Sequence, residues 1–189
     1  VDCLRCKTVM AMWEGVCDSC GAQQDSLIEK AKVVLQRNHD DAEGFLNELM
    51  FDDALKAANV IGLQNDLRLQ QFAAWHEEFL ARLESTRTSE HDRLGELLRE
   101  ALVHEQACDY DAGLQTLAKI AESLMQTTVS GGEGTAEQLI EQLTIKQSRL
   151  KELEGIVRER VIKQEITGLL PIVNELLFLN PIRPAIQDL

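Results

Sequence analysis

The chain has 189 residues, of which 44% are hydrophobic and 27% charged, a composition typical of a soluble globular protein. Its formal net charge of −13 argues against nucleic-acid binding, because an acidic chain without a basic stripe repels phosphate groups. Aromatic residues make up only 4% of the sequence, which argues against an all-β core and favours helices packed through aliphatic side chains. No apolar run approaches the roughly 20 residues that a membrane-spanning helix needs, so we expect no membrane partner.

Four of the five cysteines lie within the first twenty-one residues, as two C-x-x-C pairs separated by ten residues. The pairs are Cys3 with Cys6 and Cys17 with Cys20. Each C-x-x-C turn directs two thiolates at one point, and four thiolates complete the tetrahedral shell of a zinc ion. We therefore predict one structural Zn²⁺ per chain. A shell closed by four protein ligands leaves no position for a reactive water, which argues against catalysis at the metal.

The segment between the two cysteine pairs predicts a tight turn. Apolar residues surround Glu14-Gly15, which suits a turn between two short strands. Gly21, directly after the last cysteine, eases the backbone geometry of a metal-binding knuckle. The pattern C-x-x-C, short hairpin, C-x-x-C-G resembles a zinc ribbon, which implies a short β-hairpin with two knuckles over residues 1–25. Zinc ribbons often bind nucleic acid, but this segment has two basic and four acidic side chains, so that function ranks third.

The same four cysteines allow a redox interpretation. The pattern is similar in part to rubredoxin-like electron carriers, which bind iron through two C-x-x-C pairs. This sequence has Lys7 where that family places a glycine. A redox or electron-transfer protein is therefore the alternative function, with iron less favoured than zinc. Closely paired cysteines without a disulfide framework, and no signal-peptide pattern, predict a cytoplasmic location.

Beyond residue 25 the sequence predicts helix almost throughout. Ser26-Leu-Ile-Glu29 forms a capping box, so we expect a helix to start there and to end near Asn38. Asp40-Asp41 predicts the next helix start, because carboxylates are favourable at a helix N-terminus. In residues 65–84 and 94–107, apolar side chains recur at three- and four-residue steps, as in an amphipathic helix.

An internal repeat relates two of the helical segments: residues 47–61 align without gaps on residues 106–120. Five positions match in character, namely Phe51/Tyr110, Asp52/Asp111, Ala54/Gly113, Leu55/Leu114 and Ile61/Ile120. We interpret the aromatic residue as filling the corner of a helical hairpin, the aspartate as capping the second helix, and the small residue as allowing close helix contact. A weaker third copy is predicted through Ile166, Leu170 and Leu176 to residues 180–184.

The repeat resembles the tetratricopeptide-type (TPR) helical hairpin, in which such a corner precedes the second helix and a proline follows it. That family has a period near 34 residues, whereas the copies here lie about 60 apart, so long helices must fill the difference. The resemblance implies a mostly α fold of elongated antiparallel hairpins. We expect one helical region over residues 26–128 and a second, with a long helix and a C-terminal hairpin, over residues 129–189.

The clearest break in the helical pattern is Thr127–Gly134, which predicts a flexible loop. Thr135–Gln138 then forms a capping box before a long helix with leucines near heptad spacing. Such a helix could pair with a second copy of the chain, but Lys146 and Arg160 in the same stripe favour packing within the chain. We expect Pro171 to end or kink this helix.

The remaining candidates for chemistry favour structural interpretations. His104 and Cys108 have a spacing that can chelate a metal, but no partner ligands accompany them. Adjacent acidic residues fall mainly at predicted helix starts, where capping explains them. We therefore predict no catalytic residues and no enzyme. Trp13 and Trp75 are the residues best suited to anchor a protein partner, with burial as the competing interpretation.

These features favour a non-catalytic protein-interaction or regulatory segment, with an unidentified protein partner. Both ends of the sequence predict a piece of a larger cytoplasmic signalling protein. Ribbons followed by such hairpins resemble the accessory regions of bacterial serine/threonine protein kinases, which implies a kinase domain outside this segment.

Overall fold

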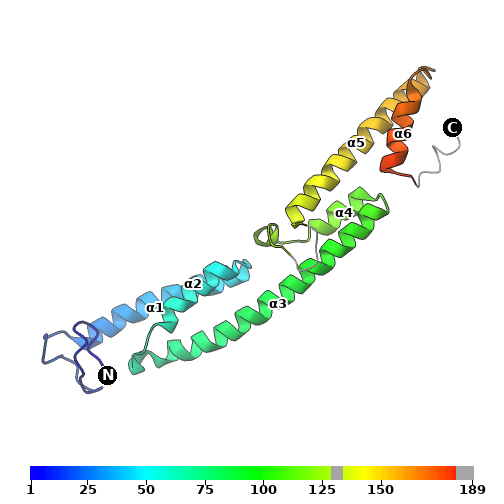
Figure 1. Ribbon diagram of the computed structural model, residues 1–189. Coiled ribbons are helices and arrows are strands. Elements are labelled where there is room, and N and C mark those ends of the chain that lie inside the picture. Colours follow the sequence, from blue (N-terminus) through cyan, green and yellow to red (C-terminus); the bar gives the residue numbers. More distant parts are fainter. Residues whose placement is uncertain (129–133, 182–189) are drawn as a thin grey trace. The chain divides into compact units, whose positions relative to one another are not determined.

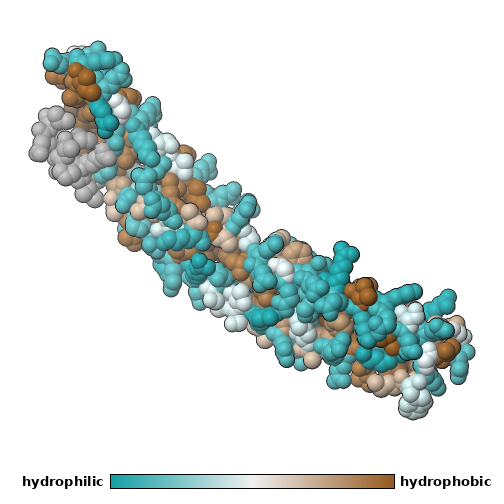
Figure 2. All heavy atoms as spheres, turned by 180° about the vertical axis from the view of Figure 1, so that it is seen from behind, coloured by the Kyte–Doolittle hydropathy of each residue, from teal (hydrophilic) through white to brown (hydrophobic). Residues whose placement is uncertain are grey.

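A computed structural model describes residues 1–128 and 134–181 of the chain, and these ranges are mostly helical (Figure 1). The helices are α1 (Gln24–Asn47), α2 (Phe51–Gly62), η1 (Leu67–Leu69), α3 (Gln70–Gln106), α4 (Tyr110–Leu117), η2 (Glu122–Leu124), α5 (Ala136–Ile162) and α6 (Leu169–Leu179), where η denotes a 3₁₀ helix. This confirms the mostly α fold class. None of the helices in the described ranges combines the length and apolar character needed to cross a bilayer. Hydrophilic side chains cover most of the face shown in Figure 2, with smaller hydrophobic areas between them.

The chain divides into two compact units, Val1–Ser89 (unit 1) and Glu90–Leu189 (unit 2), with the boundary inside α3. In unit 1, α1 and α2 pack side by side and the first part of α3 covers them. The buried cluster comprises Ala42, Leu46, Ala54, Ala58, Phe79 and Leu83. Trp75 of α3 is half-buried between this cluster and a neighbouring one, with its ring stacked on Phe79 at 4.7 Å between centroids.

In unit 2, α5 packs against both α4 and α6. The leucines that predicted the apolar stripe of α5 are buried, namely Leu139, Leu143, Leu150 and Leu153. Tyr110 at the start of α4 is also buried, and its hydroxyl donates to the carbonyl oxygen of Leu179 at 2.6 Å. The end of α6 is thereby tied to the start of α4.

Three helix–helix corners share one backbone structure. Leu49, Cys108 and Gln164 follow α1, α3 and α5, and each adopts a left-handed conformation with φ between 56° and 58°. After each of them, the next backbone N–H donates to the carbonyl oxygen five residues earlier, at 2.8 to 2.9 Å. This bond satisfies a carbonyl that the helix end would leave without a partner. The first two corners occupy aligned positions of the sequence repeat, and the third precedes the predicted third copy.

The small residue of the repeat has the role predicted for it in unit 2. A Cβ atom on Gly113 would lie 3.0 Å from Cδ1 of Leu143 and 3.5 Å from the carbonyl oxygen of Ala101, so a larger residue here would force Leu143 to move. The predicted capping by Asp52 and Asp111 was wrong, and α2 has no side-chain cap at its N-terminus. Asp109 caps α4 by accepting the N–H of Ala112 at 3.1 Å, whereas Asp111 pairs with side chains of α5.

Several predicted helix boundaries are corrected. The helix α1 starts before Ser26, which therefore does not cap it, and continues past the predicted break at residues 38–40. It continues because Leu35, Ala42 and Leu46 form one buried face. The capping box at Thr135 is confirmed, with both of its hydrogen bonds present.

Pro171 does not end α5. That helix ends at Ile162, and Pro171 lies in the first turn of α6, where its missing N–H costs little. Most of the predicted loop at 127–134, and residues 182–184 of the third copy, lie outside the described residues.

Candidate metal centre

Two cysteine knuckles in unit 1 are built alike. In the first, the N–H of Cys3 donates to the oxygen of Thr8 at 2.9 Å, and the N–H of Lys7 donates to the oxygen of Cys3 at 3.0 Å. In the second, Cys17 N–H donates to the oxygen of Ala22 at 3.0 Å, and Gly21 N–H donates to the oxygen of Cys17 at 2.8 Å. Each knuckle thus places its two cysteines on one tight backbone loop.

Each knuckle is closed by one antiparallel bridge, Asp2 with Val9 and Val16 with Gln23. Lys7 and Gly21 occupy equivalent positions with φ of 63° and 65°. The second knuckle uses glycine for this conformation, as predicted, and the first places a lysine in it. Residues 9–16 do not form the predicted pair of strands; they contain a turn in which Glu14 N–H donates to the oxygen of Ala11 at 3.1 Å.

The four predicted ligand sulfurs come together. The Sγ atoms of Cys3, Cys6, Cys17 and Cys20 all lie within 4.8 Å of one another. Two of the pairs, Cys3 with Cys20 and Cys6 with Cys17, are 3.7 Å apart. Four sulfurs bound at about 2.3 Å to a tetrahedral metal ion would be about 3.8 Å apart, and a disulfide bond would need about 2.05 Å. The spacing therefore fits one metal ion held by four thiolates.

The protonation of the thiols also fits a cation. A hydrogen bond from the backbone N–H of Cys6 lowers the pKa of Cys3 to about 6, more than burial raises it. The Thr8 hydroxyl, 3.3 Å from the sulfur, lowers the pKa of Cys6. At Cys20 the N–H of Ala22 lowers the pKa, but burial and the neighbouring sulfurs outweigh it and raise the pKa to about 12. A positive ion between the sulfurs would offset their mutual repulsion and favour the thiolate form.

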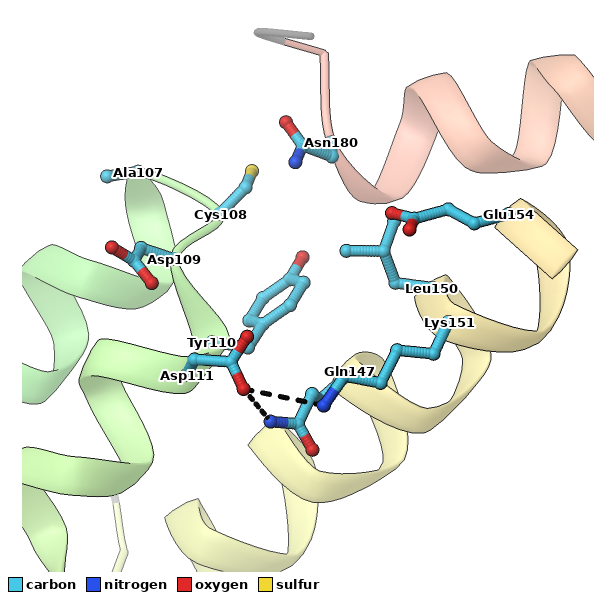
Figure 3. A pocket seen from close by; sticks show the side chains of 10 residues that line it. All are labelled: Ala107, Cys108, Asp109, Tyr110, Asp111, Gln147, Leu150, Lys151, Glu154 and Asn180. Carbon is cyan, nitrogen blue, oxygen red and sulfur yellow. Dashed lines mark hydrogen bonds and ion pairs between the residues drawn. The ribbon is translucent and has the colours of Figure 1, made fainter. Parts of the chain in front are cut away.

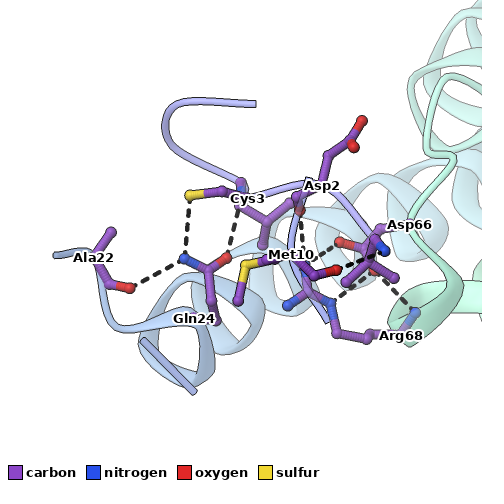
Figure 4. Close-up of polar contacts among 9 residues, drawn as sticks. Asp2, Cys3, Met10, Ala22, Gln24, Asp66 and Arg68 are labelled. Carbon is purple, nitrogen blue, oxygen red and sulfur yellow. Dashed lines mark hydrogen bonds and ion pairs between the residues drawn. The ribbon is translucent and has the colours of Figure 1, made fainter. Parts of the chain in front are cut away.

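Two residues that the sequence did not single out support this cluster, and Figure 4 shows both. Gln24, the first residue of α1, is buried and hydrogen-bonded to both knuckles. Arg68 of η1 is half-buried; it donates to Asp66 at 2.9 and 2.5 Å and to the backbone oxygen of Asp2 at 3.2 Å. The hydrogen bond with Asp66 raises the pKa of Arg68, and the charge of Cys3 acts in the same direction.

The other candidate residues lie away from this cluster. Trp13 projects from the turn between the knuckles with 88% of its surface exposed, whereas Trp75 is half-buried in the unit 1 core. His104 has Glu100 of its own helix within 3.8 Å, and Cys108 lies at the α3–α4 corner. In residues 1–128 and 134–181, no other three potential metal ligands converge.

A pocket in unit 2 contains no comparable group of metal-binding side chains among its described residues. It encloses about 380 Å³ beside the α3–α4 corner, where the side chains of Cys108, Tyr110 and Lys151 line it (Figure 3). Burial raises the pKa of Tyr110 to about 12, which keeps its hydroxyl protonated as a donor. Asp111, also on its wall, pairs with Gln147 and Lys151. These groups serve packing between helices.

Comparisons of the chain with protein-family models, with curated proteins and with solved structures found no match. The functional conclusion therefore depends on the residues themselves.

Proposed function

We propose that the chain is a non-catalytic protein-interaction segment whose N-terminal module is held together by one structural zinc ion. The tetrahedral spacing of the four cysteine sulfurs carries this proposal. Besides the cysteines, Met10 is the main buried side chain of the module's apolar cluster. So small a core cannot hold about 25 residues in one conformation, and a closed zinc shell supplies the missing stability.

The turn between the knuckles supports a role in partner binding. Trp13 is exposed, as are Val9, Met12 and Val16 around it. The backbone that presents them is fixed: the N–H of Ala11 donates to Oε2 of Glu14 at 3.0 Å, and the N–H of Gln24 donates to the oxygen of Gly15 at 2.7 Å. An apolar surface on a preorganised backbone loses little entropy on binding, and tryptophan is a frequent anchor residue.

The charges around this turn favour a basic partner. Glu14 and Asp18 line a hollow of about 430 Å³, and Asp25 lies beside Gly15 at the base of the turn. An arginine or lysine could pair with these carboxylates and stack on the exposed indole ring. We propose that the turn binds a protein segment that combines basic and apolar side chains.

The helices support a scaffold role. We propose that the hairpins with the three equivalent corners belong to the tetratricopeptide-like class and that the N-terminal module is a zinc ribbon. We further propose that the chain is a regulatory segment of a larger cytoplasmic signalling protein of bacterial type, such as the accessory region of a serine/threonine kinase. The resemblance of ribbon and hairpins to such regions is the support for this assignment.

Metal content tests the first part of the proposal. Elemental analysis of untagged protein purified without added metal should give one zinc per chain. Iron, or titratable thiols with little metal, would contradict a structural zinc and favour the redox alternative.

Peptide binding tests the second part. A synthetic peptide of alternating leucine and arginine should shift the indole N–H resonance of Trp13 in ¹⁵N-labelled protein, and the shift should weaken with salt. A leucine–glutamate peptide serves as the matched probe. In the variants, binding is followed instead by the fluorescence anisotropy of a dye-labelled peptide. Trp13→Ala should abolish binding, whereas Leu63→Ala, at another exposed apolar site of unit 1, should leave it unchanged. Equal binding of the two peptides would contradict the proposed partner.

A further inference from the structure

Gln24 is a polar side chain with only 1% of its surface exposed, and all of its hydrogen bonds reach the cysteine knuckles (Figure 4). A buried amide needs partners for its two N–H groups and its oxygen, because leaving a buried polar group unpaired is destabilising. Here the knuckles provide these partners, so the position of the side chain depends on theirs.

The contacts join the two knuckles through one amide group. Nε2 donates to Sγ of Cys3 at 3.3 Å and to the carbonyl oxygen of Ala22, in the second knuckle, at 3.1 Å. Oε1 accepts the backbone N–H of Leu4, in the first knuckle, at 3.1 Å. The amide therefore links the two knuckles directly.

The direction of the bond to Cys3 matters electrostatically. Four thiolates around a divalent ion leave a net charge of about −2. An N–H aimed at one sulfur opposes this charge, so it stabilises the metal-loaded form relative to a metal-free form in which the cysteines are protonated. Gln24 is also the first residue of α1, so the same side chain connects the metal centre to the start of that helix.

We propose that Gln24 is a positioning residue of the metal centre. It fixes the separation of the knuckles, compensates the charge on the Cys3 thiolate, and couples metal binding to the first turn of α1. This inference rests on the proposed metal binding.

The test compares three substitutions, two at Gln24 and one at its neighbour Gln23. Gln24→Glu preserves the shape of the side chain but places a carboxylate against the sulfurs, while Gln23→Glu makes the same charge change on an exposed neighbour. Gln24→Leu removes the hydrogen bonds without adding charge. The dissociation constant of Co²⁺ should be measured for each full-length protein by competition with a chelator, together with the thiolate-to-cobalt charge-transfer spectrum and the helix content.

Loss of a second-shell partner typically weakens metal binding by about 10–100-fold, so we expect that range for Gln24→Leu and a larger loss for Gln24→Glu. Gln23→Glu should change the affinity by no more than about threefold. The charge-transfer band should move to lower energy in Gln24→Leu, because the sulfur loses a donor that stabilises its lone pair. A purely structural role would not shift this band.

The outcomes separate the two proposals. If the unmodified chain binds neither Zn²⁺ nor Co²⁺, the proposed function fails and this inference with it. If it binds metal and the Gln24 variants match Gln23→Glu in affinity and spectrum, the inference alone is overturned. Should Gln24→Glu fold poorly, Gln24→Leu decides the matter through its spectrum.

Discussion

The two units make their helix–helix corners alike but are stabilised differently. The corners at Leu49 and Cys108 share φ values and hydrogen bonds, although one residue is aliphatic and the other a thiol. Unit 2 depends on the buried leucines of α5 and on exposed ion pairs. Unit 1 adds to its helical core a module whose main internal link is a cysteine cluster. The corner conformation is thus determined by backbone hydrogen bonds and not by the type of side chain, whereas the stability of the N-terminal module depends on the proposed bound ion.

Metal removal should have the largest effect and should act on one unit. Chelation, or Cys17→Ser, should unfold residues 1–23, because their apolar cluster is too small to replace the metal. Hydrogen exchange followed by mass spectrometry should show loss of protection there and unchanged protection in α5. Cys108→Ser is the control, since that sulfur lies outside the cluster. Equal loss of protection in both units would contradict the distinction between them.

Truncation of a side chain in the unit 1 core should have the second-largest effect on stability. Phe79 is buried against α1 and α2, so Phe79→Ala should lower the free energy of unfolding by about 3–5 kcal/mol. Urea denaturation measures this change. Phe178→Ala removes the same ring from an exposed position of α6 and should change stability by less than about 0.5 kcal/mol. A small effect at Phe79 would mean that α3 does not complete the unit 1 core.

Substitutions of two glycines in unit 2 test whether close helix contact, and not helix propensity alone, determines its stability. Gly113→Ala should destabilise by about 1–3 kcal/mol, because the new Cβ would meet Leu143 at 3.0 Å. Gly155→Ala in α5 meets nothing within 4 Å and should stabilise by up to about 1 kcal/mol through helix propensity. Thermal melts of the two variants should therefore move in opposite directions. A shift of the same sign in both would refute the close contact at Gly113.

The smallest effect concerns an ion pair between α5 and α6. The hydrogen bond from Arg149, 2.6 Å from Oε1 of Glu175, lowers the pKa of that carboxyl. A carboxyl group whose pKa is lowered by folding stabilises the folded state at pH values above its unfolded pKa of about 4.3. This stabilisation is lost as the pH falls through the pKa of the folded state. Because both side chains are partly exposed, Glu175→Gln should lower the stability only slightly at pH 7, and this difference should disappear at acidic pH. NMR titration of Glu175 would show an unshifted pKa if the pair does not form.

The sequence predicted the cysteine cluster because the C-x-x-C spacing is a local constraint. Each knuckle is closed by hydrogen bonds within eight residues, so no distant contact decides it. Gln24 and Arg68 could not be found in this way, because their partners are set by how α1 and η1 pack on the module. A buried glutamine at a helix start has no local pattern that separates it from exposed Gln23.

The predictions for the helical region were likewise correct where local sequence decides the structure and wrong where tertiary packing decides it. The repeat identified the corners and the close contact at Gly113, which depend on residue size at fixed spacing. It failed at Asp111, since a neighbouring aspartate caps α4 equally well and frees Asp111 to pair with α5. The break that Asp40-Asp41 predicted at residues 38–40 was also wrong, because tertiary packing of Leu35 and Ala42 keeps α1 continuous despite the polar residues between them.

The fifth cysteine has a practical consequence. Because Cys108 lies at a corner of unit 2 and the other four sulfurs lie together in unit 1, metal loading would divide the five thiols into one available group and four protected ones. A maleimide label added to the loaded protein would then attach at a single position. The ratio of labels bound with and without chelator would count the occupied metal centres in a sample directly.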